Sequence, residues 1–161
     1  NVLKFGAPKT FANSHPKGNP PEQLALSKAR WNAWVRKPEI LGAEEDFVNA
    51  KIDQMSDIMK SFGRPFGHRL RLAMKSYVAN YPESDRFNGR FKTQTALADQ
   101  VEMRLLPKLR GVDPDENSQA FSDFSNLIKN ELIDDELTKA VEISIDNSRQ
   151  NAQFNWGGVT R

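Results

Sequence analysis

The sequence contains no cysteine and only two histidines, His15 and His68. The lack of cysteine excludes disulfides, thiolate zinc sites and cysteine nucleophiles, and two histidines are too few for a histidine-rich metal centre. Long hydrophobic runs are missing too, since no apolar stretch approaches the roughly 20 residues that span a bilayer. We therefore expect a cytoplasmic protein with no metal site and no membrane partner.

The complete signatures of the common catalytic sites are also absent. The chain has no GxxxxGK[ST] phosphate loop, no GxGxxG, no HExxH and no GxSxG. Acidic pairs at 44–45 and 134–135 stand where helices are expected to start, which favours a role at the helix dipole over acid–base catalysis. The segment 113–115 (DPD) lacks the spacing of a calcium loop and predicts a turn. No catalytic residue is assigned.

The apolar pattern predicts an all-α protein of one-domain length, a bundle of about six helices behind an extended, proline-rich N-terminal arm. The arm covers 1–21, and its first five residues (NVLKF) could form a short strand. Gly63 and Pro65 predict the end of the second helix, and Pro107 must end or kink the fourth. Methionines are expected to fill gaps between helices, namely Met55, Met59, Met74 and Met103. The expected helices cover about 22–36, 44–62, 66–80, 93–106, 118–132 and 134–150.

Charge of one sign is not in large excess, because 23 basic residues face 21 acidic ones. A net charge of +2 is too small by itself to indicate nucleic-acid binding. From residue 60 to residue 82, however, no side chain is acidic. This stretch contains five basic residues, Lys60, Arg64, Arg69, Arg71 and Lys75.

Arg69 is the residue in this stretch that is best placed to bind a ligand. It is expected in the first turn of the third helix, where backbone N–H groups are unpaired and an arginine can fork two hydrogen bonds onto a phosphate. Gly67 would let an anion approach the backbone closely, and His68 stands beside it. The alternative is a solvated basic face whose charges pair with acidic residues elsewhere in the fold.

Two segments resemble a known family. Residues 64–71 (RPFGHRLR) open a helix, and 105–111 (LLPKLRG) follow some 40 residues later. Their order and spacing resemble the lid subdomain of AAA+ ATPases, in particular the motor of McrB-type modified-cytosine restriction systems. Two weaker similarities are NVLKF at the start, which resembles a last core strand, and 154–156 (FNW), which resembles the aromatic end of such lids.

The resemblance implies a function for the chain as the C-terminal lid of an AAA+ NTPase, with residues 22–161 as the lid-type domain and 1–21 as the strand end and linker from a core domain. Arg69 would be the sensor-2 arginine that reaches the nucleotide phosphates, with Gly67 and His68 beside it. The intact protein would bind ATP or GTP with Mg²⁺, assemble as a ring with its own core domain and neighbouring subunits, and act in DNA restriction or phage defence.

The phosphate loop, the Walker B acids and the arginine finger are missing from these residues, so the chain alone is expected neither to hydrolyse nor to bind nucleotide. It is either the lid part of a longer motor or a stand-alone helical domain. The alternative to the lid function is a non-enzymatic helical module. Such a module would bind nucleic acid, DNA included, or a protein through the basic face of Lys60, Arg64, Arg71 and Lys75.

Overall fold

The computed structural model describes residues 27–29, 42–82 and 91–159. The chain divides into two units, Asn1–Arg36 and Lys37–Arg161. Of the first unit only 27–29 are described, with 28–29 helical. The arm at 1–21, the strand NVLKF and most of the helix expected over 22–36 therefore lie outside the described residues.

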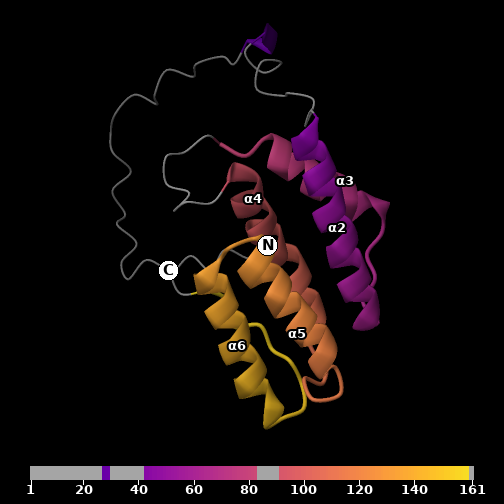
Figure 1. Cartoon of the computed structure of the whole chain (residues 1–161), viewed down its shortest axis with the longest axis vertical. Helices are drawn as coiled ribbons and strands as arrows, with labels where there is room; N and C mark the ends of the chain where they lie inside the picture. The colour runs from indigo at the N-terminus through magenta and orange to yellow at the C-terminus, as the bar shows by residue number, and fades with distance from the viewer. Residues whose placement is uncertain (1–26, 30–41, 83–90, 160–161) are drawn as a thin grey trace, which may run out of the picture. The chain divides into compact units, whose positions relative to one another are not determined.

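The second unit is built from helices, and the described residues contain no strand, which confirms the all-α fold (Figure 1). Five of the expected helices are present with boundaries close to those predicted. Helix α4 continues into a wider π turn and then a tighter 3₁₀ turn, and helix α5 continues into a π turn. In chain order the elements are α2 (Ala43–Ser61), α3 (His68–Ala79), α4 (Lys92–Gln100), the π turn η1 (Val101–Leu105), the 3₁₀ turn η2 (Leu106–Leu109), α5 (Ser118–Asn126), the π turn η3 (Leu127–Glu131) and α6 (Asp135–Arg149).

Helix α2 begins and ends where its sequence predicts. Three acidic residues occupy its first turn, and its last turn carries Lys60, so both ends suit the helix dipole. Gly63 follows with a φ of 67°, a conformation that costs glycine little. There the Arg64 N–H donates to the Met59 carbonyl at 2.8 Å, which closes the helix end.

Pro107 does not simply stop the fourth helix. The helix first widens into η1, in which the Leu106 N–H donates back to the Val101 carbonyl five residues earlier. It then tightens into η2, which contains Pro107 near its start. Because proline has no N–H to donate, the α pattern cannot continue through this point, and the change of pitch accommodates it.

The core is formed by the apolar faces of these helices. Helix α5 contacts both α2 and α6, and α3 packs against α4 (Figure 1). Phe62, Phe121 and Phe154 form an aromatic cluster, with ring centroids 4.7 Å apart for Phe62 and Phe121 and 5.0 Å apart for Phe121 and Phe154. The largest side chains that are fully buried are Phe124, Phe154, Ile52, Met55, Met59, Met74, Leu97, Leu105, Leu106, Leu109, Leu127 and Ile128.

One predicted core methionine is wrong. Met55, Met59 and Met74 are completely buried, but Met103 is 40% exposed. Met103 lies in the middle of η1, where the wider turn leaves Val101 and Leu105 to face the core. A regular 3.6-residue period does not hold through such a turn.

The C-terminal segment is tied to the end of the fourth helical region. The Phe154 N–H donates to the Val112 carbonyl at 2.7 Å, and the Gly111 N–H donates to the Phe154 carbonyl at 2.9 Å. Gly111 has a φ of 82°, which glycine adopts without a steric penalty. Phe154 is fully buried, so this pairing anchors 105–111 against the tail.

None of the helices in 27–29, 42–82 and 91–159 is both long enough and apolar enough to cross a membrane.

Candidate phosphate-binding surface

The two segments that carry the sequence resemblance meet in space. A shallow depression of about 470 Å³ lies between the start of α3 and the η1–η2 region. Its described lining residues are Arg69, Leu70, Ala73, Arg104, Pro107 and Lys108. Three of these six carry a positive charge and none is acidic, so we call this the basic depression.

Arg69 lies where the sequence predicts, in the first turn of α3, with its side chain exposed. Gly67 precedes the helix as its N-cap without a side chain to bond the first N–H groups, and no acidic residue occupies the first turn. Gly67 and His68 are also exposed, but neither lines the basic depression. The structure therefore places Arg69 at the depression and leaves its two predicted companions at the adjoining helix start.

Arg104 and Lys108, for which the sequence pattern predicted no role, line the depression together with Arg69. Arg104 belongs to η1 and Lys108 to η2, and both are exposed. They face outward because the apolar residues around them, Val101, Leu105, Leu106 and Leu109, are fully buried. A sequence signal for them does exist. Arg104 and Lys108 are four residues apart and stand on either side of the apolar pair 105–106, a spacing that puts two side chains on the same side of a helix.

Most of the predicted basic face is neutralised by acidic residues nearby. Lys60 Nζ lies 2.8 Å from Asp57 Oδ1. This interaction lowers the pKa of Asp57, chiefly through the hydrogen bond from Lys60. Arg64 is exposed and forms no ion pair with any described residue.

The same compensation occurs between α3 and α2. Arg71 pairs with Asp53 and lies 5.9 Å from the centroid of the Phe66 ring. Lys75 Nζ lies 3.9 Å from Glu45 Oε1. Arg71 therefore points toward α2, whereas Arg69 lines the depression with η1 and η2.

A tyrosine–aspartate cluster joins α3 and the residues that follow it to α4. The Tyr77 and Tyr81 hydroxyls donate to Asp99 Oδ2 at 3.0 and 2.8 Å. Burial and the negative charge of Asp99 raise the pKa of Tyr77, and the positive charge of Arg104 partly opposes that rise. Asp99 is thus satisfied by two hydroxyls, and α3 is connected to α4 close to Arg104.

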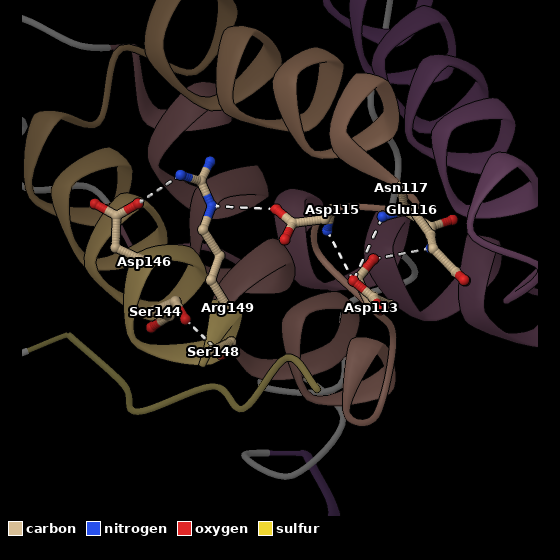
Figure 2. Close-up of polar contacts among 8 residues, drawn as sticks. All are labelled: Asp113, Asp115, Glu116, Asn117, Ser144, Asp146, Ser148 and Arg149. Atoms are coloured by element: carbon tan, nitrogen blue, oxygen red, sulfur yellow. Dashed lines mark hydrogen bonds and ion pairs between the residues drawn. The ribbon is translucent and has the colours of Figure 1, made fainter. Parts of the chain in front are cut away.

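The acidic motifs have structural roles. Asp134 caps α6, because its carboxylate accepts the Leu137 N–H at 3.0 Å. The DPD segment is a turn, as predicted: Asp113 Oδ1 accepts the Asp115 N–H at 2.9 Å (Figure 2). Arg149 holds this turn to α6, with its Nε 3.5 Å from Asp115 Oδ1 (Figure 2). Within the described ranges, no three acidic or histidine side chains gather as a metal site would require.

A second cleft, of about 540 Å³, runs between α6 and the tail at 153–159. Amides and hydroxyls such as Asn147, Asn151 and Ser148 line it. The Ser148 hydroxyl is already bonded, since it donates to the Ser144 carbonyl and accepts the Asn155 N–H (the first contact is drawn in Figure 2). The described lining of this cleft has neither a cluster of like charges nor a nucleophile beside a base, so we place the candidate site at the basic depression.

Comparison with known proteins identifies one family. A family model described as a domain of unknown function (DUF8727) matches residues 25–151. No curated protein and no solved structure matches the chain.

Proposed function

We propose that the chain, which belongs to this family of domains of unknown function over most of its length, is the lid region of a cytoplasmic AAA+ NTPase of the McrB-like kind. The chain's own residues support this proposal. In this proposal Arg69 is the sensor-2 arginine and contacts the phosphates of a nucleotide bound to a neighbouring core domain. The nucleotide is ATP or GTP with Mg²⁺, and the complete protein is a ring-forming motor in DNA restriction or phage defence.

The observation that carries the proposal is the meeting of the two resembling segments at one surface. RPFGHRLR contributes Arg69, and LLPKLRG contributes Pro107 and Lys108, to the same depression. Exposure of Arg69 suits a residue that must reach a ligand held by another domain. A guanidinium at the start of an uncapped helix is well suited to bind phosphate oxygens.

The test is Arg69→Ala in the complete protein that contains these residues. A charge-assisted hydrogen bond contributes about 1.5–3 kcal/mol, so we expect NTP turnover to fall by about 10- to 100-fold with folding unchanged. Arg149→Ala is the matched control, because it removes an exposed arginine that lies on α6 and pairs with Asp115. Turnover of Arg69→Ala near that of Arg149→Ala would overturn the sensor-2 assignment.

The second candidate, a nucleic-acid module, draws support only from the residues of the basic face. Arg64 lacks an ion pair among the described residues, whereas Lys60, Arg71 and Lys75 each have a carboxylate partner. If this candidate is correct, DNA binding falls steeply with salt and weakens in Arg64→Ala. A flat salt dependence would exclude it.

A further inference from the structure

Within the part of the chain that the structure describes, the three cations of the basic depression have no carboxylate partner, in contrast to the neighbouring cations. Among the described residues, Arg69, Arg104 and Lys108 form no ion pair, whereas Arg71 and Lys75 on the same helix α3 both do. Asp99 of α4 accepts hydrogen bonds from two tyrosine hydroxyls, those of Tyr77 and Tyr81, and pairs with none of these three cations. Cations gathered without counter-charges repel one another, and an anion bound among them removes that repulsion.

The chemistry of the depression fits phosphate oxygens. Two guanidinium groups offer planar, forked donors, and the Lys108 ammonium offers a mobile point charge. The rest of the described lining is apolar, namely Leu70, Ala73 and Pro107, of which Leu70 and Ala73 are half-buried. Apolar atoms beside charged groups reduce the local screening by water, so each cation attracts an anion more strongly than on a fully hydrated surface.

The charge and the lining of the depression favour a chain of phosphates as the group that it contacts. Three positive charges are matched by a di- or triphosphate better than by a single phosphate. None of the described lining residues is aromatic, so the described lining offers no aromatic ring on which a base could stack.

We infer that Arg69, Arg104 and Lys108 together form one binding site for the oxygens of a polyphosphate. This inference rests on the proposed function, in which the ligand is the phosphate chain of the bound nucleotide, and it adds Arg104 and Lys108 as phosphate contacts. It also changes one expectation: the chain alone binds polyphosphate weakly, although it lacks the site for the nucleoside.

The experiment is calorimetric titration of the 161-residue chain with tripolyphosphate, with ATP and with duplex DNA, at low salt and at about 0.15 M salt. We expect ATP to bind no more tightly than tripolyphosphate, because the nucleoside adds no contact and esterification removes one ionisable phosphate oxygen. Arg69→Ala, Arg104→Ala and Lys108→Ala should each weaken tripolyphosphate binding about three- to tenfold, as expected for partly screened charges. Arg104→Lys keeps the charge and should lose only the contribution of the forked geometry.

The control is Arg149→Ala, which should bind tripolyphosphate like the unchanged chain, and circular dichroism checks that every variant is helical. Absence of tripolyphosphate binding at low salt, or equal binding by all variants, overturns the inference. Tighter binding of DNA that depends on Arg64 overturns it in favour of a nucleic-acid surface.

Failure of this inference and failure of the proposed function are distinguishable. If Arg69→Ala leaves turnover of the complete protein unchanged while tripolyphosphate binding requires all three cations, the site stands and the lid assignment fails. If turnover requires Arg69 but Arg104→Ala and Lys108→Ala bind tripolyphosphate normally, the lid assignment stands and the three-cation site fails.

Discussion

Replacing Phe154 by alanine should remove a large part of the stability of the helical unit. The ring is completely buried and lies 5.0 Å, centroid to centroid, from the ring of Phe121. Truncation loses the transfer free energy of the ring and leaves a cavity, and such changes typically cost about 3–5 kcal/mol. The two backbone hydrogen bonds of Phe154 with Gly111 and Val112 are kept, so the cost comes from the side chain alone.

The assay is urea unfolding followed by far-ultraviolet circular dichroism, with thermal unfolding as a second measurement. A loss of this size should lower the Tm by about 10 °C or more in a unit of this length. The denaturant slope should stay unchanged if the variant unfolds from the same native state.

Phe91→Ala provides the matched control for the same chemical change. Phe91 is 76% exposed, so we expect the free energy of unfolding to change by less than about 0.5 kcal/mol. A cost below about 1 kcal/mol for Phe154→Ala, or one equal to that of Phe91→Ala, would refute the conclusion that the tail is part of the core.

Two further predictions concern polar side chains, one half-buried and one fully buried. The pKa of Tyr77 is raised in the folded protein, so the unfolded tyrosine releases its proton first above pH about 10 and stability falls as the pH rises. Tyr77→Phe should make this decline shallower in urea unfolding at alkaline pH, and an identical decline would contradict the assignment. Gln100 is fully buried, and neither of its amide atoms has a hydrogen-bond partner among the described residues. Gln100→Met should therefore raise the free energy of unfolding by about 1–2 kcal/mol, whereas a loss of stability would reveal an unseen partner of the amide.

The helix pattern was predictable where the apolar period was regular and the ends carried strong signals. Helix α2 shows this best, because its acidic first turn and Gly63 mark both ends. The prediction for Met103 was wrong because it assumed that the 3.6-residue period continues through a segment where the structure has a π turn. A single sequence shows the break at Pro107 but not how the backbone accommodates it.

The candidate site was predictable only in part. Arg69 was identified from its position at a helix start, which is a local property of the chain. Its companions Arg104 and Lys108 lie about 35–39 residues later and join it only because α3 packs against α4. The ion pairs of Arg71 and Lys75 with α2 likewise depend on which helix faces are adjacent.

The sequence by itself determined the all-α class, the positions of five helices and the presence of an exposed arginine at the start of α3. These properties follow from period, caps and composition, which act over a few residues. Only the tertiary structure decided which cations are neutralised and which gather in the basic depression with no ion pair to a described residue. It also decided that Phe154 belongs to the core. Electrostatic pairing and burial depend on distances between segments far apart in the chain, and those distances are set by packing.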